Sequence, residues 1–526
     1  MAAAADSKSA ALKACGFESH LRHRGEIPST MRSILPALLL LAALPCQAQT
    51  EAPAARPRNV VFILADDLGY GELGCFGQRK ILTPNLDRLA AEGVRLTQHY
   101  SGAPVCAPAR CVLLTGKHLG HAEIRGNRQA GVSFPQYKEE GQHPISGRAP
   151  TVAETLRAAG FATGAMGKWG LGPVGSSGDP NARGFDLFFG YNCQAEAHSF
   201  YPDHLWRNAE RVALNERAIP GHGTQPTGEV RAEDWTGKVH ASTPILAEAV
   251  DFISRNKGRP FFLYLPFTEP HAALQPPLAA LDQYPREWDP VPYRGQNGYT
   301  PHPRPRAAYA AMVSELDRHV GAVRAALEKA GILEDTLIIF TSDNGTTHGG
   351  KDPSIGIGGV DAAFFNSTAG LRGLKGSVHE GGLRVPTLAR WPRGIKAGTV
   401  DATPSYFADW YPTLCAAAGV KAPGGLDGDS LWPSLTGGGA TQARRPMLWI
   451  YPEYGGQVAV RLGDLKVVRK NLSGKKPGPW EVYDLAKDPG ETKDIAAEHA
   501  EAIAAARKVL REQDAGNALF PLDWDR

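Results

Sequence analysis

Short, continuously apolar runs alternate along the chain with stretches whose apolar positions recur at helical spacing. The apolar runs are typical of parallel strands buried on both faces and cover residues 59–65, 161–166, 260–266 and 335–341. The helical spacing predicts helices over residues 83–93, 151–159 and 307–330, and a further strand is predicted over 94–100. Strands that alternate with helices in this way predict an α/β fold with a parallel sheet.

The length of the chain indicates more than one structural unit. A chain of 526 residues is too long for one small core and predicts one large domain with a smaller one attached. A glycine run at 437–439 marks the predicted boundary, so we expect a large domain over 49–435 and a C-terminal subdomain over 436–526. In the latter, the pattern predicts strand structure over 458–469 and 480–485 and a last helix over 495–513.

The first 48 residues have the pattern of an export signal. An apolar run over 34–44 follows Arg32, and small residues continue to Ala48. The run is too short to span a bilayer, and no later segment is long and apolar enough to do so. The sequence therefore predicts a signal region over 1–48, with Met31 as a candidate start, and a periplasmic or secreted protein without a membrane span.

The charge balance excludes some classes of partner. Lys and Arg number 57 and Asp and Glu number 54, which gives no sign of a nucleic-acid or membrane-surface partner. Selectivity for an anion would have to come from a local site. Five of the seven cysteines lie outside the leader and lack the spacing of a metal site, and the sequence does not pair them in disulfides.

Polar side chains follow two of the predicted buried strands. Asp66 and Asp67 come directly after the first strand, and Asp343 and Asn344 follow the strand at 335–341. Ligands of open α/β sheets gather beyond the carboxyl ends of strands, and an all-oxygen set suits Ca²⁺ or Mg²⁺ rather than zinc. Taken alone, the pair Asp66 and Asp67 is equally compatible with a helix cap. The sequence Asp343-Asn344-Gly345, taken alone, is compatible with an ordinary turn.

The segment 106–116, Cys-Ala-Pro-Ala-Arg-Cys-Val-Leu-Leu-Thr-Gly, begins a predicted helix after a loop. Pro108 suits a first helical turn, and Arg110 shares a helix face with Cys106, four positions earlier. The helix N-terminus and the guanidinium fork both favour an anion. From these residues alone, Cys106 is either a reactive thiol at an anion site or a small buried cysteine.

Two lysines and a histidine are further candidates. Lys168 and Lys375 are flanked by glycines or loop residues that allow close approach to an anion, although solvated loop lysines are the alternative. His271 follows the strand at 260–266 and is a candidate general acid or oxyanion donor.

The stretch Cys-x-Pro-x-Arg followed by Leu-Leu-Thr-Gly resembles the signature of the type I sulfatases. The resemblance extends from about residue 59 to a Tyr-Asp-Leu…Asp-Pro pattern near the C-terminus. It implies an alkaline-phosphatase-like α/β core with a mixed, mostly parallel sheet flanked by helices. It also implies a smaller C-terminal α+β domain with a four-stranded antiparallel sheet.

The same resemblance implies roles for individual residues. Cys106 would be converted to Cα-formylglycine by a formylglycine-generating enzyme, and Arg110 would steady the hydrated aldehyde. The implied ligands of a Ca²⁺ ion, with Mg²⁺ as the alternative, are Asp66, Asp67, Asp343, Asn344 and the modified Cys106. The residues that would grip the sulfate oxygens are Lys168, His271 and Lys375, with His271 as proton donor to the leaving alcohol.

The chain departs from the family pattern at one position of the site. Many relatives read Gly-Lys-Trp-His-Leu-Gly, with a histidine that contacts the formylglycine, whereas this chain has Gly170 there. His118 and His198 are candidate replacements, and the alternative is a branch of the family that works without this histidine. A milder change is Ala109, where Ser is common in the family.

The resemblance implies a hydrolase that cleaves sulfate monoesters of a sulfated carbohydrate or an aryl sulfate. Two alternatives stay open at this point. One is a formylglycine-dependent phosphonate or phosphate ester hydrolase of the same superfamily, and the other is an inactive binding module with an unmodified cysteine. Specificity is expected to reside in the loops 190–207 and 348–366, which do not by themselves identify a sugar.

Overall fold

A computed structural model describes residues 56–128, 142–349, 356–439 and 445–526. The predicted signal region, residues 1–48, and the candidate start at Met31 lie outside the described residues. Among the described residues, no helix has both the length and the apolar character needed to cross a membrane.

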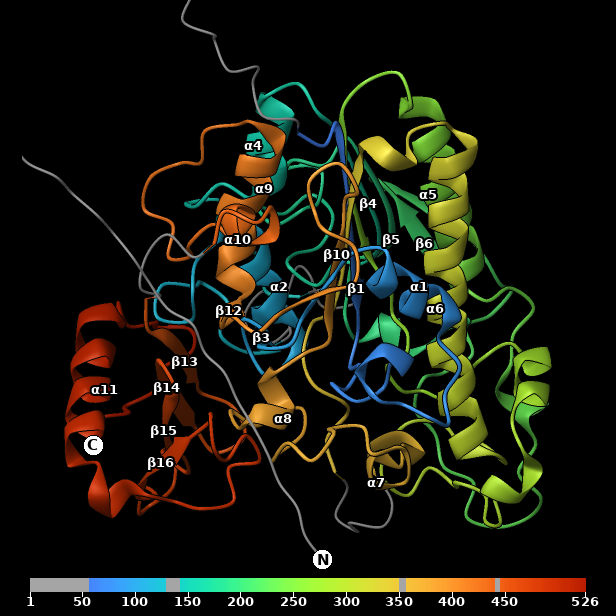
Figure 1. Ribbon diagram of the computed structural model, residues 1–526. Helices are drawn as coiled ribbons and strands as arrows, with labels where there is room; N and C mark the ends of the chain where they lie inside the picture. Colours follow the sequence, from blue (N-terminus) through green and yellow to red (C-terminus); the bar gives the residue numbers. More distant parts are fainter. Residues whose placement is uncertain (1–55, 129–141, 350–355, 440–444) are drawn as a thin grey trace, which may run out of the picture. The chain divides into compact units, whose positions relative to one another are not determined.

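The described chain is organised around a mixed sheet of ten strands, shown in Figure 1. In order across the sheet they are β11 (Thr399–Asp401), β2 (Val94–Leu96), β10 (Thr387–Arg390), β9 (Thr336–Ser342), β1 (Asn59–Ala65), β8 (Phe261–Pro266), β4 (Ala162–Lys168), β5 (Leu187–Tyr191), β6 (His204–Arg207) and β7 (Glu210–Ala213). The central strands β9, β1, β8, β4 and β5 are mutually parallel, and antiparallel pairs occur toward both edges. The four apolar runs of the sequence are β1, β4, β8 and β9, so the predicted mixed, mostly parallel sheet is confirmed.

Helices cover both faces of this sheet (Figure 1). One face carries α1 (Pro84–Ala91), α5 (Ser242–Asn256) and α6 (Pro305–Lys329), and the other carries α2 (Cys106–Thr115), α4 (Val152–Ala158) and α9 (Trp410–Ala418). Side chains of a strand point alternately to the two faces, so β1 contributes to both cores. Val61 and Ile63 pack in the core under α5 and α6, and Val60 and Phe62 pack in the core under α2 and α9. Shorter helices are α7 (Ala362–Phe365), α8 (Glu380–Leu383) and α10 (Trp432–Leu435).

The predicted single strand over 94–100 is wrong, because the chain changes partners halfway. β2 ends at Leu96 in the large sheet, and β3 (His99–Tyr100) pairs in parallel with β12 (Ser405–Tyr406) as a separate two-stranded sheet. The two short strands bring the chain to the loop that precedes α2.

The C-terminal part contains the four-stranded antiparallel sheet that the family resemblance implied. Its strands are β13 (Met447–Tyr451), β14 (Gln457–Leu462), β15 (Leu465–Arg469) and β16 (Trp480–Asp484), and the last helix is α11 (Ala500–Gln513). The continuous strand pattern over 458–469 is in fact a hairpin that turns at Gly463, where φ is +63°. The described residues from 56 onward belong to one compact unit, and the boundary after residue 435 stays a prediction.

Candidate active site

Four predicted metal ligands are brought together at one edge of the sheet. β1 and β9 run in parallel, so Asp66 and Asp67 after β1 lie beside Asp343 and Asn344 after β9. The backbone amide of Asp67 donates to Oδ1 of Asp343 at 3.2 Å. All four residues are 1% exposed or less. Carboxylates buried to this extent need cations or hydrogen-bond donors close by.

Arg110 supplies donors to two of these carboxylates. It lies one turn into α2 and is fully buried. Its Nε and Nη2 donate to Oδ2 of Asp343 at 3.1 and 2.8 Å. The same Nη2 donates to Oδ2 of Asp66 at 3.0 Å, and Nη1 donates to the backbone carbonyl of Lys168. Cys106, the first residue of α2, places its Sγ 3.3 Å from Oδ1 of Asp66. The guanidinium fork therefore holds the acidic edge of the sheet against the start of α2.

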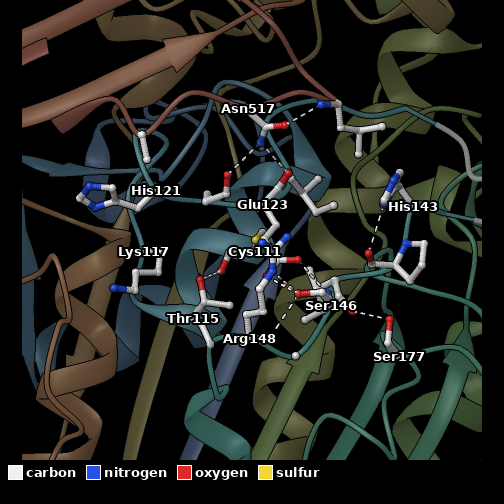
Figure 2. Close-up of a pocket in the computed structure, with 18 of the residues that line it drawn as sticks. Cys111, Thr115, Lys117, His121, Glu123, His143, Ser146, Arg148, Ser177 and Asn517 are labelled. Atoms are coloured by element: carbon white, nitrogen blue, oxygen red, sulfur yellow. Dashed lines mark hydrogen bonds and ion pairs between the residues drawn. The ribbon is translucent and has the colours of Figure 1, made fainter. Parts of the chain in front are cut away.

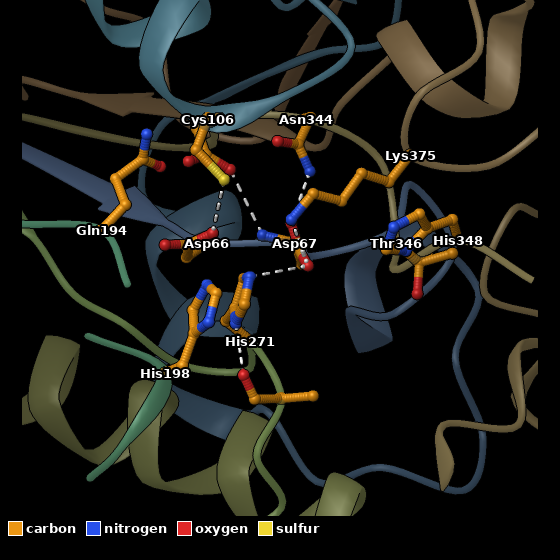
Figure 3. A network of polar contacts seen from close by, with 12 residues as sticks. Asp66, Asp67, Cys106, Gln194, His198, His271, Asn344, Thr346, His348 and Lys375 are labelled. Atoms are coloured by element: carbon orange, nitrogen blue, oxygen red, sulfur yellow. Dashed lines mark hydrogen bonds and ion pairs between the residues drawn. The ribbon is translucent and has the colours of Figure 1, made fainter. Parts of the chain in front are cut away.

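Both predicted lysines face the acidic pair after β1. Nζ of Lys168 lies 2.5 Å from Oδ2 of Asp66, and Nζ of Lys375 lies 2.7 Å from Oδ1 of Asp67. Burial alone would lower the pKa of Lys375, but the combined charges of Asp67, Asp66 and other neighbouring groups hold it well above its usual value. Figure 3 shows how Lys375 and His271 approach Asp67.

His271 presents one ring nitrogen to the site. Its Nδ1 bonds the carbonyl oxygen of Ala272, which can only accept, so this nitrogen carries the proton. Nε2 faces Oδ2 of Asp67 at 3.5 Å. Burial and then the charge of Lys375 lower the pKa of His271 well below its usual value. The ring is therefore neutral at neutral pH, and donation from Nε2 requires a second proton on the imidazole.

The electrostatics of the site do not favour a thiolate. Burial raises the pKa of the Cys106 thiol, and the negative charges of Asp343 and Asp66 raise it further. Burial also raises the pKa of Asp343, to about 6, with a further contribution from Asp66. For Asp66 itself, burial acts in the same direction, but Lys168 and other neighbouring positive charges hold its pKa far below the usual value. Cys106 is a protonated thiol at neutral pH, so the unmodified residue is a poor nucleophile.

The donor set fits a divalent cation. One potential ligand atom from each of Asp66, Asp67, Cys106 and His271 lies within 4.8 Å of the others. Oδ1 of Asn344 is buried and has no hydrogen-bond partner among the described residues, while its Nδ2 donates to Oδ1 of Asp67 at 2.7 Å. An ion would give that orphaned amide oxygen a partner, and the predominance of oxygen donors suits Ca²⁺ or Mg²⁺.

Gln194, from the loop after β5, packs against Gly170, where many relatives have a histidine. Gly170 has φ of +81°, and a Cβ there would lie 2.8 Å from Cγ of Gln194. Of the two candidate replacement histidines, His198 stacks on His271 with ring centroids 4.8 Å apart. His118 lies beyond the C-terminal end of α2, the opposite end from the predicted nucleophile, so it does not reach the site.

Residues near the site come from loops that sequence reasoning covered only in part. Gln194 and His348 lie in the two loops predicted to set specificity; residues 350–355 of the second loop are outside the described residues. Tyr454, between β13 and β14, was not anticipated. Its hydroxyl lies 3.0 Å from Nε2 of His348, and its ring lies against Gly376, next to Lys375. No spacing in the sequence marks Tyr454, because only tertiary packing brings it here.

A separate cavity lies along the later turns of α2 (Figure 2). It has a volume of about 1170 Å³, and its lining includes Cys111, Thr115, His121, Arg148 and Asn517. None of the candidate catalytic or metal-binding residues lines it. The catalytic chemistry of the chain is therefore not located in this cavity.

Comparisons with known proteins agree with this geometry. The sulfatase family matches residues 58–420, and the family described as N-sulphoglucosamine sulphohydrolase, C-terminal, matches residues 374–515. The chain is 33% identical to steryl-sulfatase of Mus musculus, over 76% of this chain and 68% of that protein. It is 32% identical to arylsulfatase A of Homo sapiens, over 87% of each protein.

Among solved structures, the crystal structure of Ps i-CgsB in complex with k-i-k-neocarrahexaose is similar, with a TM-score of 0.71 and 26% identity, over 89% of this chain and 96% of that chain. The family match covers more than half of the chain, and the relatives match along most of their length. This chain therefore belongs to the family of type I sulfatases, enzymes that hydrolyse sulfate monoesters.

Proposed function

We propose that this sulfatase removes sulfate from carbohydrates and that residue 106 carries the nucleophile as Cα-formylglycine. The observation that carries the proposal is the position of Cys106. It is the first residue of α2, 1% exposed, and its sulfur lies among the carboxylates and cations of the site. A protonated thiol has no evident use at this point, whereas the hydrate of an aldehyde supplies an oxygen nucleophile.

The residues around position 106 have separate tasks in this proposal. Asp66, Asp67, Asp343 and Asn344 would hold a Ca²⁺ ion, with Mg²⁺ as the alternative. When bound, such an ion lowers the pKa of an attached hydroxyl group and offsets charge on the sulfate. Arg110 orients the carboxylates of Asp66 and Asp343 through the hydrogen bonds described above.

Two lysines supply the remaining positive charge. Lys168 and Lys375 are 0% and 7% exposed, so their charges act in a site largely closed to water. Cations fixed in this way stabilise negative charge that develops on sulfate oxygens during cleavage. His271, whose Nε2 faces the site, is the candidate proton donor to the leaving alcohol once its imidazole is protonated.

A carbohydrate substrate is favoured by the surroundings of Lys375 and by the relatives. Tyr454 is 53% exposed, and its ring lies next to the turn that carries Lys375, so a flat apolar surface adjoins the cationic site. Its hydroxyl and His348 add polar groups at the same place, a combination suited to a sugar ring. N-acetylgalactosamine-6-sulfatase of Canis lupus familiaris is 31% identical over 81% of this chain and 74% of that protein. The similar structure of Ps i-CgsB was determined with an oligosaccharide.

The proposal includes a maturation step and export. Conversion of Cys106 requires a formylglycine-generating enzyme as a transient partner. Residues 1–48 would direct the chain to the periplasm or outside the cell, which N-terminal sequencing of protein recovered from those compartments would test. A mature N-terminus upstream of residue 34 would contradict the proposed signal region.

The mass of the tryptic peptide that ends at Arg110 tests the proposal directly. The protein should be made in a host with a formylglycine-generating enzyme, and the peptide should be lighter by the exchange of thiol for aldehyde. Cys106→Ala should abolish turnover of an aryl sulfate, while Cys111→Ala, a matched change in the same helix, should retain it. An unmodified thiol together with undiminished turnover would refute the formylglycine mechanism.

The choice of substrate is tested on the same preparation. Desulfation of sulfated oligosaccharides should proceed with a higher kcat/KM than that of aryl sulfates, because only the former can use the surface at Tyr454. Tyr454→Ala should lower kcat/KM for the oligosaccharide and leave that for the aryl sulfate nearly unchanged. Faster cleavage of an aryl phosphonate than of an aryl sulfate would favour the phosphonate hydrolase instead.

A further inference from the structure

Gln194 has an unused hydrogen-bond acceptor in the site. It lies in the loop after β5 and is 4% exposed. Its Oε1 is buried and has no hydrogen-bond partner among the described residues. A buried amide oxygen without a donor is unfavourable, so a group that is present only in the working enzyme is expected to fill this place.

The orientation of the Gln194 amide is fixed by its neighbours. The backbone amide of Ala107 donates to Oδ1 of Asn127 at 2.9 Å, and a backbone N–H can only donate, so the oxygen of Asn127 must face α2. Nε2 of Gln194 donates to the same oxygen at 3.3 Å. Asn127 is held in turn by Glu453, whose carboxylate accepts its backbone N–H at 2.9 and 3.1 Å. With Nε2 turned toward Asn127, Oε1 is the end of Gln194 that is left for the site.

The same contacts place Gln194 next to the predicted nucleophile. It shares an acceptor with the residue that directly follows Cys106, and Figure 3 shows its amide turned toward the side of the site that holds Cys106 and Asp66. The backbone of Gly170 leaves room for Gln194, because a Cβ there would lie 2.8 Å from its Cγ.

We propose that Oε1 of Gln194 accepts a hydrogen bond from a hydroxyl group carried by residue 106 in the matured enzyme. Gln194 is then a positioning residue for the nucleophile. An amide oxygen attracts a hydroxyl hydrogen and repels a sulfate oxygen, so the partner is residue 106 rather than the sulfate group. This inference rests on the proposed presence of formylglycine at position 106.

The variant Gln194→Met tests the inference, because methionine has a similar length and no acceptor of comparable strength. Gln283→Met, at an exposed glutamine, is the matched control. Peptide mass should show residue 106 converted in both variants, and melting should change by only a few degrees. We expect kcat of Gln194→Met on an aryl sulfate to fall about tenfold with KM nearly unchanged, the size expected for one hydrogen bond.

A second measurement does not depend on turnover. The aldehyde of the converted protein can be trapped as an oxime with an aminooxy probe, and only the free aldehyde reacts. Gln194→Met should react several-fold faster than wild type, since loss of the hydrogen bond shifts the equilibrium away from the hydrate. Gln194→Ala should behave in the same way and serves if the methionine variant does not fold.

The outcomes separate this inference from the proposed function. A converted, active wild type with unchanged kcat and oxime formation in the Gln194 variants would overturn the role of Gln194 alone. A lower kcat with unchanged oxime formation would also overturn it and indicate a packing role. An unconverted thiol in an active wild type would overturn the proposed mechanism and this inference together.

Discussion

Lys466 provides a sharp test of what holds the C-terminal sheet to the site-bearing part of the chain. It lies in β15 with no exposed side-chain surface, and its Nζ lies 2.8 Å from Glu380 and 3.2 Å from Glu491. Glu380 begins α8, a few residues after Lys375. Both carboxylates are fully buried, and the ammonium group of Lys466 bridges them. Arg384 lies 3.6 Å from Glu380, and His379 lies 3.2 Å from Glu491.

The expected size of the effect follows from this geometry. Lys466→Met removes the cation between two buried carboxylates, a change that typically costs about 3–5 kcal/mol of the free energy of unfolding. Glu380 keeps a hydrogen bond from the Tyr100 hydroxyl at 2.6 Å, which favours the lower end of that range. With an unfolding entropy of about 2.1 cal/mol/K per residue, a protein of this size loses about 1 °C per kcal/mol, so the Tm should fall by about 3–5 °C.

The pH dependence of this loss has a defined sign. In the wild type, burial would raise the pKa of Glu491, but Lys466, His379 and the backbone N–H of Glu380 together outweigh it and lower the pKa to about 2. The stabilisation from Glu491 is therefore present above its unfolded pKa of about 4.5 and is lost as the pH falls from there toward 2. In Lys466→Met, burial is opposed only by the weaker contributions of His379 and the Glu380 backbone, so the pKa of Glu491 rises and the variant recovers stability as this carboxylate takes up a proton. The difference in Tm between wild type and variant should narrow from pH 8 to pH 5.

Thermal unfolding followed by circular dichroism between pH 5 and pH 8 measures both quantities. Lys487→Met is the matched control, because the ion pair of Lys487 with Asp484 is on the surface and should contribute little. The double variant Lys466→Met/Glu491→Gln should regain part of the loss, since one buried charge is removed with the cation. If Lys466→Met melts with the control, or if its deficit grows as the pH falls, the charge argument is wrong.

Three further predictions concern the site. Arg110→Lys cannot donate to Asp66 and Asp343 from one planar fork, so kcat should fall at least tenfold. The fraction of formylglycine, measured by peptide mass, should stay unchanged. A kcat equal to that of wild type would contradict the role of the fork. Chelation with EDTA should abolish turnover and lower the Tm of the wild type. Added Ca²⁺ or Mg²⁺ should restore both quantities in the wild type and much less in Asn344→Ala. Chelation without effect on either quantity would refute the metal site. Gly170→His should melt a few degrees lower than wild type, because φ at this position is +81° and the new Cβ would press on Gln194. Adding Gln194→Ala to this variant should restore part of the lost Tm. A higher Tm in Gly170→His than in wild type would contradict the steric reasoning.

Much of the sheet could be predicted because its signals are local. β1, β4, β8 and β9 are continuous apolar runs, and their ends fall within two residues of the predicted ends. The failures have non-local causes. The strand predicted over 94–100 divides because the backbone amide of Thr97 still pairs with Asp401, whereas the next residues pair with β12. No property of the residues from 94 to 100 announces that exchange of partners.

The hairpin between β14 and β15 is a different case, since its signal was present in the sequence. Gly463-Asp464 is a glycine-containing turn between two alternating runs, and the alternation continues on both sides of it. The pairing of β14 with β15 then follows from the turn alone. A two-residue glycine turn divides an alternating pattern into two strands even where the alternation itself is unbroken.

The candidate site shows the same division between local and non-local information. Asp66, Asp67, Asp343 and Asn344 could be grouped from sequence, because parallel strands deliver their carboxyl ends to one edge. The partners of Arg110 could not, since a guanidinium fork suits a bound anion and a carboxylate equally well, and the structure shows two carboxylates. Gln194 and Tyr454 reach the site only through packing of distant segments, which no spacing rule encodes.

The balance of charge within the site explains how a nearly neutral chain can select an anion. Three buried carboxylates are matched by three cationic side chains, those of Arg110, Lys168 and Lys375, and His271 is neutral. The side chains alone therefore give little net attraction for a sulfate ester. A divalent ion held by the carboxylates would leave the site with a net positive charge, concentrated where the two lysines already point. Affinity for the sulfate group then depends on metal binding. The surface at Tyr454 and His348 would act on the rest of the substrate. Two separable sources of binding energy allow one catalytic centre to serve different sulfated compounds, with the choice among them made by loops outside the charged cluster.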